Sequence, residues 1–285
     1  MVRAASRRAL ERNWVADFGF TMPNGRKYPW QWLWDSCFHA IAWSALGDDR
    51  CRTELESLFS LQLPTGFMPH MGYQRDPEKS LALWHSAGRS DITQPPMYGH
   101  ALRVLASRGF ALEQLYGPAT LALRYLFERR RDAGSGLLRV LHPWETGCDD
   151  SPRWDGWEAR PFSERRWNKH KRELVRSLVL ADGGASENPG FDVASAGFTA
   201  LVSFNMRELA ELTGDDELRR SADELADAIE RRWVPERRTW ADVRLCGYGT
   251  GARARTLDGL FAVLVSGDEP HVQAAFTELF DSDRF

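Results

Sequence analysis

The strongest constraint on the fold is the regular alternation of helical segments and loops along the whole chain. In segments of ten to twenty residues, apolar side chains recur at the spacing of one helix face, which predicts amphipathic helices. Nine segments show this pattern, at residues 2–16, 35–45, 50–63, 97–108, 112–131, 191–212, 217–233, 256–265 and 270–280, and the basic segment 160–180 is moderately helical. Their alternating short and long loops suit an all-α helical toroid, in which the long loops gather on one face and form a site there.

Strands are expected to contribute little. No segment shows a convincing alternation of apolar and polar residues, apart from a short apolar run at 137–141 that fits a strand or a turn. The glycine-rich stretch 183–190 is expected to be a loop. With 285 residues, the chain is long enough for one large core, so we expect a single domain over 1–285.

Charge and composition exclude several classes of partner. The net charge of −3 gives no basic surface for nucleic acid or for anionic lipid. No apolar run follows the charged N-terminal residues, so neither a signal peptide nor a transmembrane segment is expected. The four cysteines are scattered without metal-site spacing, which favours reduced thiols in a cytoplasmic protein. We expect no metal and no organic cofactor.

One loop gathers unusual chemistry. The run HPWETGCDDSPRWD (142–155) carries four carboxylates, two tryptophans, a histidine and an arginine. Its prolines exclude a continuous helix, and Gly147 permits backbone angles that other residues avoid. Repulsion between adjacent acids and burial beside indole both raise a carboxyl pKa, so one of these acids is expected to hold a proton near neutral pH. A protonated acid beside flat apolar rings suits the cleavage of a glycosidic bond.

The alternative is that such a loop is only a solvated surface connection, which is the usual behaviour of acidic, proline-rich loops. A second segment, YPWQWLWD (28–35), argues against this, because surface loops have no reason to gather so many aromatic rings. The chain holds 12 tryptophans, about three times the ordinary usage. Some belong to the core, and the others favour stacking on a carbohydrate.

Two polar residues beside these segments have two interpretations each. Asp35 stands where the extended pattern of 30–34 changes to helical spacing, and this position favours a helix N-cap. Asp35 also fits a binding residue whose carboxylate accepts hydrogen bonds from sugar hydroxyls. The two roles are compatible. Gln94 lies just before the helix at 97–108, where its amide faces a cavity or serves only a turn.

Four motifs in the same order resemble glycoside hydrolase family 63, in its bacterial branch of glucosylglycerate and mannosylglycerate hydrolases. They are YPWQWLWDSCFHA (28–40), PTGFMPHM (64–71), SDITQPP (90–96) and HPWETGCDDSPRWD (142–155). The resemblance implies an (α/α)6 barrel and hydrolysis of α-glycosidic bonds with inversion. It further implies that Asp149 is the general acid. The glycone pocket then contains Tyr28, Trp32, Trp34 and Asp35. The resemblance places Gln94 and Trp144 at further sugar-contacting positions, and Gly147 is also expected to bind substrate.

The sequence departs from the family at its end. The family's catalytic base is a glutamate in a late motif like E-Y-x-x-P-x-T-G, which the chain does not contain. An (α/α)6 barrel has twelve helices, and about nine are expected here, so we expect an incomplete barrel whose base is missing. Its open gap would expose apolar surface and favour aggregation or self-association, including a homo-oligomer.

Three functions follow. The first is an inverting α-glycosidase for a small glucoside or mannoside such as glucosylglycerate or mannosylglycerate. The second is an oligosaccharide α-glucosidase with the same acid. The third is an inactive, truncated fragment that binds sugar.

Overall fold

The computed structural model describes residues 2–157, 160–246 and 254–281. Within these ranges helices dominate, as expected. The α-helices are α1 Val2–Asn13, α2 Leu33–Ala45, α3 Arg50–Phe59, α4 Tyr98–Ser107, α5 Tyr116–Arg129, α6 Glu164–Arg176, α7 Ala196–Thr213, α8 Asp216–Glu230 and α9 Glu269–Asp281. Short 3₁₀ helices are η1 Pro77–Ala82, η2 Glu113–Leu115, η3 Pro143–Thr146, η4 Pro152–Trp154 and η6 Leu257–Leu264. The last of these was expected to be an α-helix and is wound more tightly.

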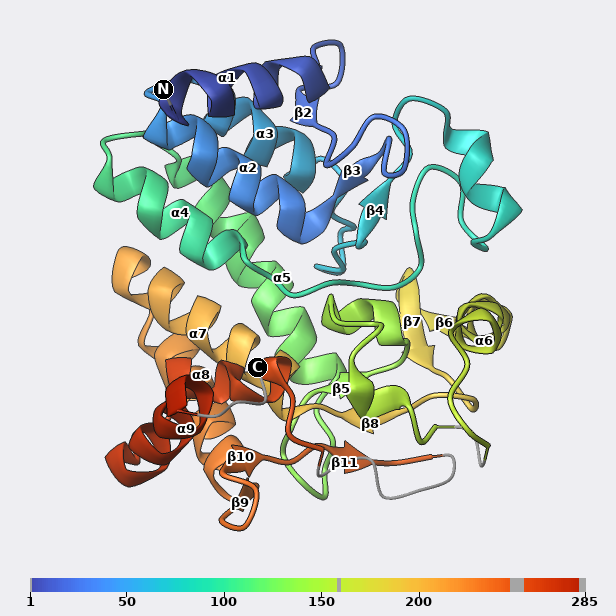
Figure 1. The fold of residues 1–285 in the computed structure, drawn as a ribbon. Helices are drawn as coiled ribbons and strands as arrows, with labels where there is room; N and C mark the ends of the chain where they lie inside the picture. Colours follow the sequence, from blue (N-terminus) through green and yellow to red (C-terminus); the bar gives the residue numbers. More distant parts are fainter. Residues whose placement is uncertain (1, 158–159, 247–253, 282–285) are drawn as a thin grey trace.

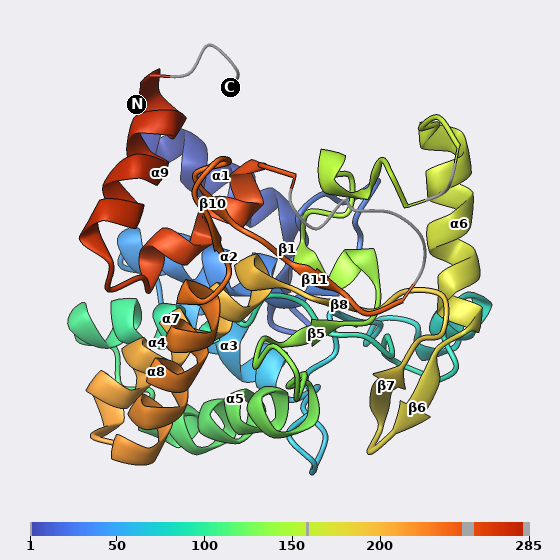
Figure 2. The same cartoon turned by 90° about the horizontal axis from the view of Figure 1, so that it is seen from below.

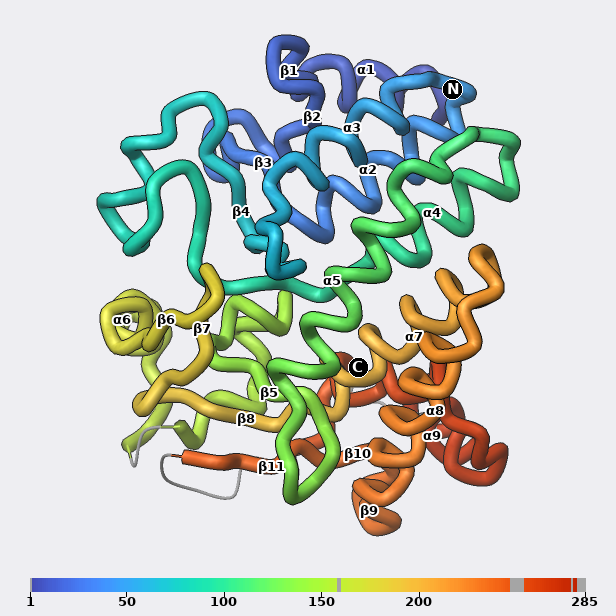
Figure 3. The backbone as a smooth tube through the Cα atoms, turned by 180° about the vertical axis from the view of Figure 1, so that it is seen from behind, coloured from blue at the N-terminus to red at the C-terminus, as the bar shows by residue number. Residues whose placement is uncertain are grey.

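Most of the helices pack around a common core, and the neighbours are not always consecutive in sequence (Figure 1). Helix α2 packs against α3 and α4, α4 against α7, and α7 against α8 and η6. From behind, α5 lies between the group α2–α4 and the group α7–α8 (Figure 3). The main core joins these helices through fully buried side chains such as Trp43, Leu102 and Met206. In none of the described helices does a stretch combine the length and apolarity that crossing a bilayer requires.

Short strands occur between the helices, and their number was not expected. They are β1 Trp14–Val15, β2 Phe20–Thr21, β3 Gln31–Trp32, β4 Met71–Gly72, β5 Arg139–Val140, β6 Val179–Ala181, β7 Gly184–Glu187, β8 Val193–Ala194, β9 Trp233–Val234, β10 Thr239–Trp240 and β11 Val243–Arg244. The pairs are antiparallel, and β11, β8 and β5 form one three-stranded sheet. Strand β5 confirms the strand interpretation of 137–141.

Several expected segment boundaries were wrong. The helices expected over 160–180 and 191–212 begin later, and residues 179–181 form β6 while residues 193–194 form β8. The first helix ends at Asn13 instead of residue 16, because the chain then reverses through Gly19 (φ 69°) and Trp14–Val15 pair with Phe20–Thr21. The expected loop 183–190 is largely strand β7, paired with β6. The turn between them is Asp182-Gly183, both with positive φ, which is a strong hairpin signal.

Helix α6 and the β6–β7 hairpin lie at the edge of the molecule. Both the front view and the view from below show α6 beside this hairpin and away from the packed helices (Figures 1 and 2). The hairpin docks through Gly184, where any Cβ would clash with the Phe67 ring. This peripheral unit matters because α6 contacts the acidic loop.

Candidate active site

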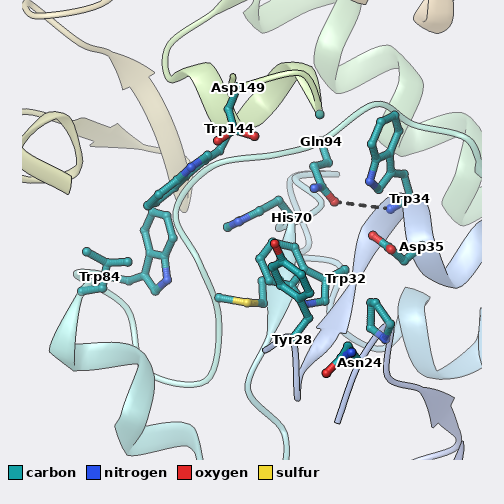
Figure 4. A pocket seen from close by; sticks show the side chains of 14 residues that line it. Asn24, Tyr28, Trp32, Trp34, Asp35, His70, Trp84, Gln94, Trp144 and Asp149 are labelled. Carbon is teal, nitrogen blue, oxygen red and sulfur yellow. Dashed lines mark hydrogen bonds between the residues drawn. The ribbon is translucent and has the colours of Figure 1, made fainter. Parts of the chain in front are cut away.

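A pocket of about 640 Å³ opens between the aromatic segment and the acidic loop. All eight residues that the sequence suggested for a site line it, namely Tyr28, Trp32, Trp34, Asp35, Gln94, Trp144, Gly147 and Asp149. The lining also contains Pro23, Asn24, His70, Met71, Leu83 and Trp84. Figure 4 shows Trp34 and Asp35 on one side, Trp84 and Trp144 on the other, and His70 between them. The structure thus brings the predicted residues together, and their roles remain a proposal.

The first side of the pocket is the junction of β3 and α2, which we call the aromatic wall (Tyr28–Asp35). Strand β3 pairs with β4, so Trp32 lies opposite Met71. The Tyr28 and Trp32 rings meet edge to face at 5.5 Å, and Trp32 meets His70 in the same way at 5.2 Å. Such contacts fix ring orientation and leave flat faces free for a sugar.

Asp35 is not the N-cap of α2, so the capping interpretation was wrong. The N-cap residue is Trp32, which makes no side-chain cap bond, and Asp35 lies inside the first turn. The first amides of the helix find other acceptors: Leu33 N donates to the His70 carbonyl at 2.9 Å, and Trp34 N lies 3.5 Å from Gln94 Oε1. Asp35 lines the pocket.

Burial raises the pKa of the Asp35 carboxyl, and the nearby His39 partly opposes that rise. Asp35 and Asp149 are the only carboxyl groups among the described residues that line the pocket. None of these lining residues is a lysine or an arginine.

Two buried histidines support the opposite side and stay neutral. Burial lowers the pKa of His70 to about 3 and that of His142 to about 3. His70 Nδ1 lies 2.6 Å from the Ser90 hydroxyl. His142 Nδ1 accepts from Trp144 N at 3.1 Å, so its Nε2–H donates to the Lys171 carbonyl at 2.7 Å. His70 and Trp84 were not predicted as site residues, although both stand in segments rich in aromatic rings.

The second side, which we call the acid wall, is the segment His142–Asp149. Glu145 is fully buried and pairs with Arg130 through both carboxylate oxygens, at 2.8 and 3.0 Å. The same oxygens accept from the amides of Leu141 and Thr93. Glu145 therefore has a scaffold role and cannot reach a substrate.

Gly147 brings the two walls into contact. Its φ of 69° is in the left-handed region, and a Cβ there would clash with the Trp34 ring. Only glycine combines this turn with this approach. The glycine of the acidic loop thus decides how close the indole of the aromatic wall can lie.

The Asp149 side chain is 30% exposed and borders the pocket. Its carboxylate accepts from the Lys171 ammonium, which also donates to Asp150 Oδ1 at 2.7 Å. The Trp167 indole N–H donates to the Asp149 carbonyl oxygen at 2.8 Å. Both contacts come from α6, and no motif in the sequence pointed to Lys171 or Trp167.

Two partly buried carboxyls and several flat ring faces together suit a polyhydroxylated ligand. Rings present faces to sugar C–H groups, the carboxylates accept bonds from hydroxyls, and one acid can give a proton to a leaving oxygen.

Comparison with known proteins agrees with this chemistry. Residues 28–285 match the family described as "Mannosylglycerate hydrolase MGH1-like glycoside hydrolase domain". A mannosylglycerate hydrolase from Thermus thermophilus is 32% identical over 242 residues, covering 71% of this chain and 58% of the relative. A glucosylglycerate hydrolase from Mycolicibacterium hassiacum is 28% identical, covering 90% of this chain and 70% of the relative.

The fold agrees as well. A GH63 mannosylglycerate hydrolase from Thermus thermophilus, solved with Tris and D-glycerate, superposes with a TM-score of 0.79 at 26% identity and covers 98% of this chain and 76% of that one. This likeness confirms the expected (α/α)6 toroid. The chain spans 58% of the Thermus thermophilus relative that is 32% identical to it, and 32% of a Selaginella moellendorffii mannosylglycerate hydrolase. From its matching segment, its relatives and its fold, the chain belongs to the family of mannosylglycerate hydrolase MGH1-like glycoside hydrolase domains, of the GH63 type.

Proposed function

We propose that this chain forms the sugar-binding pocket and carries the general acid of an α-glycosidase that acts with inversion on a small glucoside or mannoside. Glucosylglycerate and mannosylglycerate are the proposed substrates, because the two named relatives hydrolyse these compounds. The proposal is supported most directly by one observation: Asp149 and the aromatic wall line the same pocket. We further propose that 1–285 belongs to one toroidal domain.

In this proposal the glycone lies against Tyr28, Trp32 and Trp34, with Asp35 and Gln94 accepting or donating bonds to its hydroxyls. Asp149 donates its proton to the glycosidic oxygen as the bond to the anomeric carbon breaks. A water oxygen bonds to that carbon from the opposite face and gives its proton to the base. Trp144 and Gly147 close the pocket beside the acid. Inversion needs a second carboxylate about 6.5–9.5 Å from the acid with a water between them, and we assign no residue to that role.

Replacing the acid tests the proposal. Asp149→Asn is expected to lower kcat/KM about 10²–10⁴-fold, because general acid catalysis is lost, while glucose affinity changes only a few-fold. Hydrolysis is assayed on glucosylglycerate, mannosylglycerate and a glucose disaccharide, with NMR of the first-formed anomer to detect inversion.

The matched control is Asp155→Asn, an exposed acid of the same loop, which should keep wild-type activity. If Asp149→Asn keeps more than half of the wild-type rate, the acid lies elsewhere. Calorimetry with glucose measures the sugar pocket separately from turnover.

A further inference from the structure

One buried ammonium serves two neighbouring carboxylates. The Lys171 side chain is 3% exposed, and its Nζ contacts both Asp149 Oδ2 and Asp150 Oδ1. The two acids differ in setting, since the Asp149 side chain is 30% exposed and that of Asp150 is 66% exposed. A buried ammonium is costly unless it is paired, so Lys171 must keep at least one of these partners at all times.

Helix α6 holds Lys171 at this place by further bonds to the same loop. The Lys171 carbonyl accepts from His142, and Trp167, one turn earlier, donates to the Asp149 backbone. The ammonium is therefore held between the two acids from helix α6.

We propose that Lys171 is a positioning residue that is shared between Asp149 and Asp150 and follows the charge on the acid. While Asp149 holds a proton, the ammonium pairs with Asp150. Once Asp149 has given that proton to the glycosidic oxygen, and the electron pair of the broken bond has gone to the same oxygen, Asp149 is left with one negative charge. Lys171 then pairs with Asp149 again. This inference rests on the proposed role of Asp149 as general acid.

Other charged or titratable groups on the surrounding elements do not take the place of this pair. Arg153 is already bound to Asp242 and Asp258 at 2.7 Å each. His142 is buried and neutral, with a pKa of about 3. The charged or titratable side chains around the loop are Lys171 and His170 of α6, His142, Arg153, Asp242 and Asp258. Asp35 and His70 face the loop from across the pocket.

The proposal predicts opposite effects for two substitutions. Lys171→Met removes a positive neighbour that favours the ionised acid, so the alkaline limb of the pH–rate profile should move up by about one pH unit. Asp150→Asn leaves the ammonium to Asp149 alone and removes a like charge, so the same limb should move down by about as much. A residue with a merely structural role would change stability without these opposite shifts.

The experiment records kcat/KM against pH for the wild type, Lys171→Met, Lys171→Arg and Asp150→Asn. In parallel, carboxyl ¹³C NMR follows the titration of Asp149, whose signal is identified by its absence in Asp149→Asn. Lys171→Arg keeps the charge and should stay near the wild-type midpoint. The matched control is Lys169→Met on the same helix, because Lys169 is 79% exposed and pairs only with Glu173 among the contacts described.

Midpoints that stay unmoved, or that move in the same direction in both variants, would overturn the proposal. If Lys171→Met does not fold, Asp150→Asn still decides. Loss of an exposed like charge is screened by solvent, so a downward shift of about one pH unit is expected only if the ammonium is also released to Asp149. The NMR arm separates the two proposals. If Asp149→Asn is fully active and the NMR midpoints still shift in opposite directions, the lysine is shared but Asp149 is not the acid.

Discussion

A fully buried glutamate supports each wall of the pocket, and the negative charges of the two glutamates are compensated in different ways. Behind the aromatic wall, Glu54 of α3 accepts from the Thr21 amide and hydroxyl at 2.8 and 2.7 Å and from the Ser36 hydroxyl at 2.7 Å. The nearest nitrogen of a side chain able to carry charge is His39 Nδ1, at 3.8 Å. Behind the acid wall, Glu145 instead forms a two-bond pair with Arg130.

The difference follows the charge that each wall presents to the pocket. The acid wall carries Asp149 and is followed directly by Asp150, so a further uncompensated carboxylate there would add repulsion. Arg130 and Lys171 supply two cations. The aromatic wall presents mostly rings, so neutral hydroxyl and amide donors suffice for Glu54. A buried acid inside a motif, such as Glu145, can thus have a structural role only, whereas Asp149, the acid that suits catalysis, is partly exposed.

The largest effect on stability is expected from Arg130→Met. This change leaves Glu145 buried without its cation, which costs about 3–5 kcal/mol in the free energy of unfolding. Chemical denaturation measures the loss. The double variant Arg130→Met/Glu145→Gln should recover part of it, because the amide oxygen still accepts one backbone bond without a buried charge. A loss below about 1 kcal/mol in the single variant would show that the ion pair is not what holds the acid wall.

A smaller loss is expected from Glu54→Gln. The variant removes the charge and leaves no unpaired ion. Its NH₂ group is a donor in place of a carboxylate oxygen, so one of the three accepted hydrogen bonds is lost, which costs about 1–3 kcal/mol in the free energy of unfolding. The control is Glu56→Gln on the exposed side of the same helix. If Glu54→Gln proves as costly as Arg130→Met, the two walls do not differ in the way described.

Gly147→Ala tests the contact between the walls. A Cβ at a φ of 69° would overlap the Trp34 ring, which forces either the loop or the indole to move. We expect a loss of about 1–3 kcal/mol in stability together with weaker glucose binding. Gly156→Ala, where nothing lies within 4 Å of the added Cβ, is the control. Unchanged affinity would mean that Trp34 does not contact the sugar.

Much of this arrangement could be predicted from the sequence, because helical periodicity and the four motifs are local patterns. The helices and all eight pocket residues came from such patterns. The capping role of Asp35 was mistaken because the true acceptors for the α2 amides, the His70 carbonyl and Gln94, are distant in sequence. Lys171 was missed for the same reason, since a lone lysine on a basic helix gives no sign of the loop that it meets.

The smallest effect on stability, and one of opposite sign, is expected from Asp35→Asn. Burial disfavours the negative charge of this carboxylate, whereas His39 and, by about 0.3–1 kcal/mol, the start of α2 favour it. Burial outweighs both, because the pKa of Asp35 is raised above its usual 3.8. A raised folded-state pKa means that the folded protein binds the proton more tightly. The stability contribution of Asp35 is therefore greatest at low pH and is lost as the pH rises through the raised pKa.

Asparagine cannot ionise, so the variant should gain stability relative to the wild type above that pH and lose this advantage below about pH 4. Glucose affinity should nevertheless fall about tenfold, because a charged acceptor for sugar hydroxyls becomes a neutral one. Melting temperatures across about pH 3–8 and calorimetry with glucose on the same protein measure both effects. A variant that melts lower at neutral pH with unchanged affinity would assign Asp35 to the helix. One that melts higher and binds weakly would show a carboxylate kept ionised for a ligand at a cost to the fold.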